Sequence, residues 1–146
     1  MLKSLSAILV VGLLALIQSL GFSFLGIKPN LVISAVIAGS FFVKDLFEGL
    51  LLVALSVLIL KFSPDSGNEI ILLSLIGAVS VLIERHLPWR HFVDNLVLIA
   101  AGTIVFYLVL APDLILGMIF LKELILNLVF GSLIFAFFSA LWQNKE

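Results

Sequence analysis

The charged residues of this chain are confined to short clusters that separate long apolar blocks. No charged side chain occurs between Lys3 and Lys28 or between Glu123 and Lys145, and the region between these stretches is divided into shorter apolar blocks. A charged side chain at the centre of a bilayer costs about 2.5 to 3.5 kcal/mol on insertion scales, so membrane-spanning segments exclude charge. The pattern predicts a polytopic membrane protein.

The lengths of these blocks predict the individual helices. Uncharged runs at 4–27, 95–112 and 124–144 reach the ~18 residues that a spanning helix needs, whereas the other blocks are shorter and need their flanking residues to reach both interfaces. Short connections leave room for one compact domain, residues 1–146. We predict an all-α, compact bundle of six transmembrane helices, at about 4–25, 30–44, 46–62, 69–86, 90–110 and 122–142.

The second and third helices have an alternative interpretation, and the loops predict an orientation. Residues 30–62 form a re-entrant pair in the alternative, which is tolerated only where protein shields the exposed backbone. With six helices, the side that holds both termini carries more Lys and Arg than the other side. Because cytoplasmic loops carry the excess of basic residues, both termini are predicted to lie in the cytoplasm.

Composition supports the membrane assignment and excludes some functions. The chain is 63% hydrophobic and 12% charged, against about 45 to 50% and about 25% for ordinary domains, so membrane lipid is an expected partner. A formal net charge of −1 without a basic patch gives no basis for nucleic-acid binding. The absence of cysteine excludes disulfides and thiolate metal sites.

The last apolar segment carries a face of polar and small residues. Gly131 follows Asn127 at helical spacing, and Ser132, Ala136 and Ala140 form a small-xxx-small stripe beside them. Small residues let helix backbones approach closely, and an intramembrane amide can bridge to a neighbouring helix. We expect this face to pack inside the bundle. Docking of a partner's helix on the stripe and a substrate contact by Asn127 are the alternatives.

The densest polar cluster lies at 84–94. Its two histidines lie on either side of a proline, off the shared i, i+4 face of a helical metal pair, so no metal or catalytic site is predicted there. Arg90 and Asp94 have the spacing of a helical ion pair. Arg85, Trp89 and Arg90 are expected to anchor this loop at the interface or to form a docking surface for a cytoplasmic protein.

A short apolar run follows Pro112 and Asp113, at 114–121. Eight residues are too few to span a membrane. Asp113 is expected to cap a helix there. The run is interpreted as an extension of the last helix or as interfacial packing, with an extracytoplasmic protein contact through Asp113, Leu116 and Phe120 as the alternative.

Nearly the whole chain resembles, in pattern, the rod shape-determining protein MreD family. The resemblance rests on size, on six close-set hydrophobic segments, on the Lys28-Pro29-Asn30-Leu31 motif, and on Leu126-Asn127 in the last segment. The family often carries Gly-Leu-x-x-Asp in its third segment. Here residues 49–53 read Gly-Leu-Leu-Leu-Val, so the acidic member is absent.

This resemblance implies a function without catalysis. The expected protein is a non-enzymatic scaffold of the cell-wall elongation (rod shape) complex in the bacterial cytoplasmic (inner) membrane. Its implied partners are a MreC-like bitopic protein and other elongation-complex proteins. No cofactor is expected, and no catalytic motif points to an enzyme.

A second hypothesis comes from the fold that the resemblance implies. That fold is similar to the substrate-binding S subunits of energy-coupling-factor vitamin transporters. Such a subunit needs a pocket where polar and aromatic groups converge near one face. The sequence offers few candidates for such a pocket, and we therefore rank this hypothesis second.

Overall fold

The six predicted helices are present, in the predicted order. The computed structural model describes residues 2–62, 67–87 and 91–143, and no strand is assigned within these ranges. The elements are α1 (Leu2–Ser19), α2 (Leu31–Ser40), α3 (Leu46–Leu60), α4 (Gly67–Glu84), α5 (His91–Leu110), the 3-10 helix η1 (Pro112–Leu114) and α6 (Met118–Gln143). The all-α fold class is confirmed.

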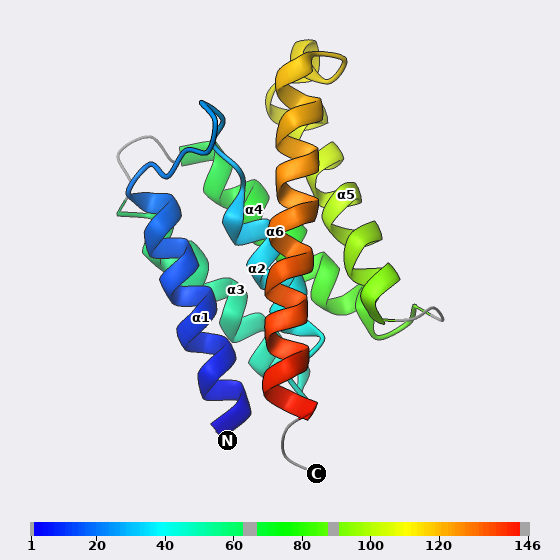
Figure 1. Cartoon of the computed structure of the whole chain (residues 1–146). Helices are drawn as coiled ribbons and strands as arrows, with labels where there is room; N and C mark the ends of the chain where they lie inside the picture. Colours follow the sequence, from blue (N-terminus) through cyan, green and yellow to red (C-terminus); the bar gives the residue numbers. More distant parts are fainter. Residues whose placement is uncertain (1, 63–66, 88–90, 144–146) are drawn as a thin grey trace.

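Successive helices run in opposite directions, which gives the bundle two distinct ends (Figure 1). The start of α1, the α2–α3 turn and the end of α6 lie at one end, which we call the terminal end. The segment after α1 and the region around η1 lie at the other, which we call the distal end. Short connections favour this antiparallel arrangement of neighbouring helices.

The short helix α2 occupies the centre of the bundle. All ten of its residues are buried, and it packs against each of the other five α-helices. Small side chains at Ser34, Ala35, Ala38 and Gly39 allow these close approaches. A helix of this length rises only about 15 Å, half the hydrocarbon thickness of about 30 Å. The predicted second span at 30–44 is therefore too long, because α2 ends at Ser40.

Helix α1 also ends earlier than predicted. Gly21 adopts a left-handed conformation (φ +78°) and its N–H bonds to the carbonyl of Gln18 at 2.9 Å, which stops the helix after Ser19. A tight turn then follows, with positive φ at Leu25 and Gly26. Two backbone hydrogen bonds close this turn between the residues on either side of it. Residues 20–30 are therefore a loop, where the sequence pattern predicted helix to residue 25.

Within the described part of the chain, three helices are long and apolar enough to cross a membrane, namely α4, α5 and α6. Helices α2 and α3 are apolar but shorter than this length, and α1 has 18 residues, of which Ser4–Ser19 form an apolar stretch. Two of the three expected long spans are confirmed, in α5 and α6. The expected span at 4–27 is too long because α1 ends at Ser19, and α4 reaches 18 residues because it begins at Gly67.

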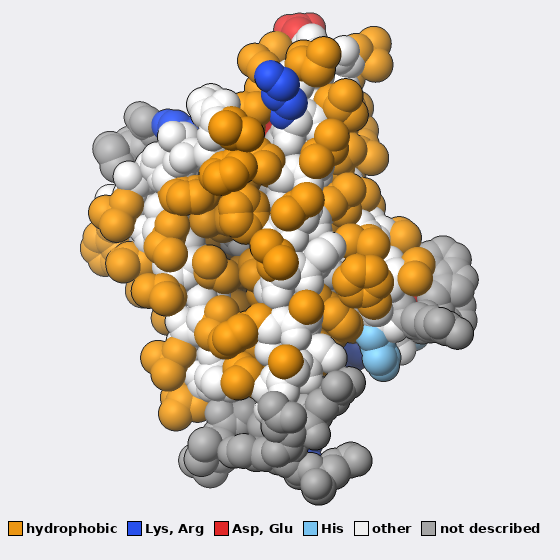
Figure 2. Space-filling model, in the orientation of Figure 1, with side chains coloured by type: hydrophobic (Ala, Val, Ile, Leu, Met, Phe, Trp, Pro, Cys, Tyr) orange, Lys and Arg blue, Asp and Glu red, His pale blue; other side chains and the backbone are white. Residues whose placement is uncertain are grey.

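Large apolar side chains cover the outside of the bundle. Figure 2 shows them across the middle of one face, with the visible charged side chains toward the ends. Exposed leucines, isoleucines, valines and phenylalanines occur on each long helix, such as Leu9 on α1, Leu75 on α4 and Leu133 on α6. Monomeric soluble proteins rarely expose contiguous apolar patches beyond a few hundred Å². This surface is that of a membrane protein.

Aromatic rings fill the terminal end. The ring of Phe42 packs against Phe135, Phe138 and Trp142, with centroid separations of 5.0, 5.6 and 5.3 Å. These contacts join the end of α2 to the last turns of α6. Ring pairs at such separations stabilise beyond their buried area. The terminal end is therefore packed with side chains, whereas the distal end is hollow.

Candidate functional site

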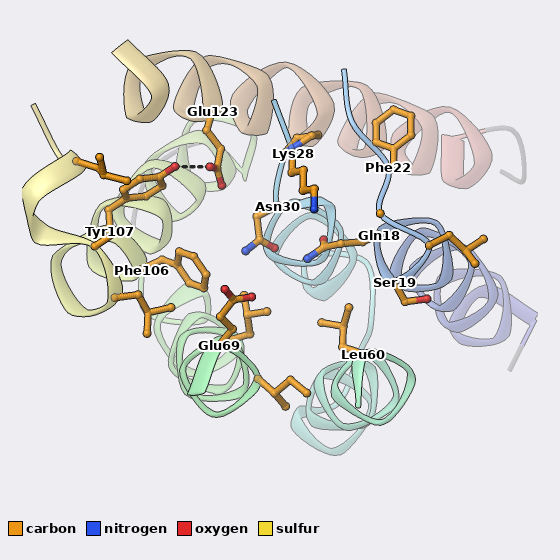
Figure 3. A pocket seen from close by; sticks show the side chains of 18 residues that line it. Gln18, Ser19, Phe22, Lys28, Asn30, Leu60, Glu69, Phe106, Tyr107 and Glu123 are labelled. Atoms are coloured by element: carbon orange, nitrogen blue, oxygen red, sulfur yellow. Dashed lines mark hydrogen bonds between the residues drawn. The ribbon is translucent and has the colours of Figure 1, made fainter. Parts of the chain in front are cut away.

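The distal end contains a cavity of about 620 Å³. Its walls come from the end of α1, the loop at 20–30, and the ends of α3, α4, α5 and α6 that meet there, with Leu114 of η1 (Figure 3). Polar side chains that line it are Gln18, Ser19, Lys28, Asn30, Glu69, Tyr107 and Glu123. This volume lies within the range of about 300 to 1,000 Å³ typical of small-molecule sites. The sequence offered few candidates for such a pocket, and the structure gathers these side chains around one cavity.

Tyr107 and Glu123 form one wall of the cavity. The hydroxyl of Tyr107 donates a hydrogen bond to Oε2 of Glu123, which joins the end of α5 to the start of α6 (Figure 3). The Tyr107 ring packs edge-on against Phe120 at a centroid distance of 5.0 Å and is only 6% exposed. Packing and the hydrogen bond together fix this carboxylate at the cavity wall. Its second oxygen remains available to a ligand.

Gln18 and Asn30 cap the first turn of α2, beneath the cavity. Oε1 of Gln18 accepts from the backbone N–H of Val32 at 2.8 Å, and Oδ1 of Asn30 accepts from that of Ile33 at 3.2 Å. Both amide oxygens therefore serve N–H groups that the helix itself leaves unbonded. In Figure 3 the nitrogens of both side chains point into the cavity. These amides present donors there.

Lys28 and Glu69 approach the cavity from opposite sides. Lys28 lies on the loop after α1 and Glu69 on the first turn of α4, and Figure 3 shows both side chains directed inward. Both are exposed, and neither side chain forms an ion pair or a hydrogen bond with another described residue. With Glu123, the lining holds two carboxylates and one ammonium.

Aromatic rings complete the lining. Phe106 faces the cavity, whereas Phe22, which also lines it, turns its ring toward α6 (Figure 3). Phe22 and Phe24 also pack edge-on against Phe130 of α6, at 6.2 and 6.3 Å, and so hold the loop against the bundle. Across the described ranges, no three His, Asp or Glu side chains converge in a way that could hold a metal ion. The cavity is suited to an organic ligand with polar and apolar parts.

The predicted face on α6 divides into an inner and an outer part. Asn127 and Gly131 are buried, whereas Ser132 is half-buried and Ala136 and Ala140 are exposed. Because α6 turns by about 100° per residue, positions adjacent in sequence diverge to different sides. The structure confirms internal packing for Asn127 and Gly131, and it places Ser132, Ala136 and Ala140 on the outside.

Asn127 joins three helices. Its Oδ1 accepts from the backbone N–H of Asn30 at 2.8 Å, and its Nδ2 donates to Oγ1 of Thr103 at 3.1 Å. Its backbone carbonyl accepts from Ser34 Oγ at 2.9 Å. Helix α6 is thereby bonded to the start of α2 and the middle of α5. The expectation that this amide bridges to a neighbouring helix is confirmed.

A shallow groove runs along the outside of the bundle between α5 and α6. It has a volume of about 460 Å³ and is lined by Leu96, Val97, Ala100, Leu128, Val129 and Ser132. Ser132 thus belongs both to the groove and to the small-residue stripe that continues through Ala136 and Ala140. The groove and stripe form a continuous surface, which we call the α5–α6 face.

Only part of the predicted cytoplasmic docking loop can be located. Trp89 and Arg90 lie outside the described residues, and with them the predicted pair between Arg90 and Asp94. Arg85 is exposed, and its guanidinium donates to the carbonyl of Lys44 at 3.4 Å, across the terminal end. Its neighbour Glu84 accepts a hydrogen bond from Ser40 Oγ. These contacts link the end of α4 to the α2–α3 turn.

The predicted extracytoplasmic contact is divided by the structure. Asp113 lies within η1 and caps no helix, since α6 begins at Met118 and the residue that precedes η1 is Ala111. The predicted cap is therefore wrong. Leu116 is 98% exposed, whereas Phe120 is half-buried against Tyr107. Of this group, Phe120 supports the cavity wall, and Asp113 and Leu116 remain on the surface.

Several polar residues at the distal cavity and in the core were missed from sequence. Lys28 and Glu123 bound the two longest uncharged runs and Glu69 flanks a shorter one, but their convergence at one cavity was not expected. The signal was present in the topology, because the first, third and fifth connections all lie at one end of a six-helix bundle. Asp94 and Asn95 were also missed. Both are at most 1% exposed, and no described residue provides a hydrogen-bond partner for either carboxylate oxygen of Asp94.

Comparison with known proteins identifies no relative on which a functional assignment can rest. No family model matches the chain, and no curated protein or solved structure is significantly similar to it.

Proposed function

We propose that this protein is a non-enzymatic scaffold of the bacterial cell-wall elongation complex that receives a partner's transmembrane helix on its α5–α6 face. The single observation that carries this proposal is the outward position of Ser132, Ala136 and Ala140 beside the groove between α5 and α6. Small side chains allow close helix–helix approach in lipid, where apolar surface alone provides little drive for association. Their exposure leaves that capacity unused within the bundle.

The burial of α6 supports the same proposal. In the most apolar 18-residue stretch of α6, only 22% is buried inside the chain, against 33% for α4 and 39% for α5. Most of the α6 surface is therefore left for lipid or for another helix. A groove between two helices admits one further helix. A bitopic protein has a single transmembrane helix and therefore fits this groove. The resemblance to the MreD family adds a specific candidate, a MreC-like partner.

The proposed membrane arrangement has six crossings and cytoplasmic termini. Six antiparallel helices with both chain ends at one end of the bundle support an even number of crossings (Figure 1). Because α3 is short, the membrane thins locally around it and its charged flanks reach the interface. Helix α2 crosses inside the protein, where its neighbours shield its backbone.

Cysteine cross-linking tests the scaffold function directly, because the chain contains no cysteine. We would co-express an Ala136→Cys variant with the MreC-like protein of the same genome, carrying single cysteines along its transmembrane helix. A disulfide-linked product with helical periodicity along the partner is expected. The matched control is Leu75→Cys on α4, which is 60% exposed on another helix. Absence of the product at 136, or equal yield at 75, would remove the proposal.

A second candidate function is favoured by the cavity at the distal end. Polar and aromatic groups from several helices converge there, as in a substrate-binding S subunit of an energy-coupling-factor vitamin transporter. Mass spectrometry of small molecules released from the purified protein distinguishes the two functions. A vitamin at one equivalent per chain supports the transporter subunit, and its absence together with the 136 cross-link supports the scaffold.

A further inference from the structure

We propose that the distal cavity binds an organic ammonium group attached to an apolar body. The observation behind this proposal is the convergence of Glu69 and Glu123 with the rings of Phe106 and Tyr107 around one space of about 620 Å³. The inference concerns the cavity alone, and it holds whether or not a partner helix docks on the α5–α6 face.

The charge of the lining favours a cation. Glu69 and Glu123 provide two carboxylates, and among the described lining residues Lys28 is the only charged group of opposite sign. Glu123 keeps one oxygen free of the Tyr107 hydrogen bond. The Glu69 side chain has no ion-pair or hydrogen-bond partner among the described residues, and it points inward from α4 (Figure 3). An ammonium group placed between them gains charge-assisted hydrogen bonds.

The remaining walls select what the ammonium is attached to. The rings of Phe106 and Tyr107 lie on the same side of the cavity as Glu123 (Figure 3). Aromatic faces attract organic cations and also accept apolar groups. Gln18 and Asn30 supply amide donors beneath the cavity, and the loop carrying Phe22 forms one of its walls. A primary amine with a flat or aliphatic body satisfies these groups together, whereas an anion would face two carboxylates.

Isothermal titration calorimetry on the full-length protein in a neutral detergent tests this inference. The probes are 2-phenylethylamine, which is protonated at pH 7, and its uncharged analogue 2-phenylethanol. The amine is expected to bind at least tenfold more tightly than the alcohol, because both share the ring and only one carries the charge. Equal affinities would overturn the proposal, since they would indicate partition into apolar surface only.

Three variants locate the binding site. Glu69→Gln is expected to weaken amine binding at least fivefold, and Lys28→Gln is expected to strengthen it about threefold because a repulsive charge is lost. A gain in affinity cannot arise from misfolding, so the second variant keeps the test decisive. Glu48→Gln removes a carboxylate at the terminal end and serves as the matched control, with unchanged affinity. Unchanged affinity in both cavity variants would overturn the assignment.

The ammonium group has two possible sources, a soluble amine and the headgroup of phosphatidylethanolamine. Short-chain phosphatidylethanolamine and short-chain phosphatidylglycerol are added as competitors of 2-phenylethylamine. Competition by the first lipid alone identifies a headgroup as the natural occupant. Competition by neither lipid identifies a soluble amine. Equal competition by both lipids would overturn the charge selectivity that the proposal requires.

Discussion

The side-chain oxygen of Asn127 accepts a hydrogen bond from the backbone N–H of Asn30 at 2.8 Å, across 97 positions of sequence. This bond satisfies one of the N–H groups that the start of α2 would otherwise leave unbonded in the interior. Asn30 itself caps the same helix through its side chain. The central helix is thus held at its first turn by the last helix of the chain, just beneath the distal cavity.

Replacement of Asn127 by leucine is expected to destabilise the bundle by about 1 to 3 kcal/mol, since two side-chain hydrogen bonds of about 0.6 to 1.7 kcal/mol each are lost. The measurement is unfolding by denaturing detergent. Thr103→Val, which leaves the bond from Asn30 to Oδ1 intact but removes the bond from Nδ2 and the bond from Thr103 Oγ1 to the Ile99 carbonyl, tests the α5 side of this contact. Asn68→Leu alters an exposed amide and is the control. Unchanged unfolding of the Asn127 variant would show that the bonds contribute no net stability.

Gly131 permits the closest approach of α5 and α6. A Cβ at this position would lie 2.1 Å from Cδ1 of Ile99, which is fully buried. Gly131→Ala is therefore expected to destabilise the bundle by about 1 to 3 kcal/mol through overpacking. Ile99→Val removes the clashing methyl group and alone should cost about 0.5 to 1.5 kcal/mol.

The double variant provides the critical comparison. The double variant at 131 and 99 should lose less free energy of unfolding than the two single variants lose in total. The expected difference is about 0.5 to 3 kcal/mol. Gly67→Ala is the glycine control, because its added Cβ would meet no atom within 4 Å. Strict additivity at 131 and 99 would contradict the close contact.

Membrane topology can be tested with single cysteines at the two ends of the bundle. Asp45 precedes α3 without a side-chain capping bond, and Asp113 lies exposed in η1, so neither substitution should disturb folding. In cells whose outer membrane has been removed and whose inner membrane is intact, an impermeant maleimide is expected to label Asp113→Cys. It should label Asp45→Cys only after the inner membrane is permeabilised. The reverse pattern would invert the orientation, and labelling of both from one side would contradict six crossings.

Much of the architecture was predictable because lipid excludes charge. The six helices follow from the apolar blocks, and their order follows from the short connections between them. Helix ends were less predictable, since they depend on local backbone conformation. Gly21 ends α1 by adopting a positive φ. Hydropathy averaged over a stretch of sequence does not report the backbone conformation of a single residue.

The candidate sites were predictable to different degrees. The amide of Asn127 could be identified as a bridge because an isolated amide in an apolar segment needs a partner. The identity of that partner could not, because it lies 97 positions away. The cavity was not predicted either, since its lining combines residues from several helix ends and a loop that the hydropathy pattern had assigned in part to helix.

Hydropathy and charge placement were sufficient to establish an all-helical chain with a lipid-facing exterior, because the cost of burying charge in hydrocarbon acts on each segment independently. Only three-dimensional packing decided which apolar segment forms the core. Helix α2 lies at the centre because its small residues admit five neighbours, and α6 presents small residues outward because its inner side is already occupied by Asn127 and Gly131. The hollow distal end likewise depends on contacts among distant segments, which no single stretch of sequence encodes.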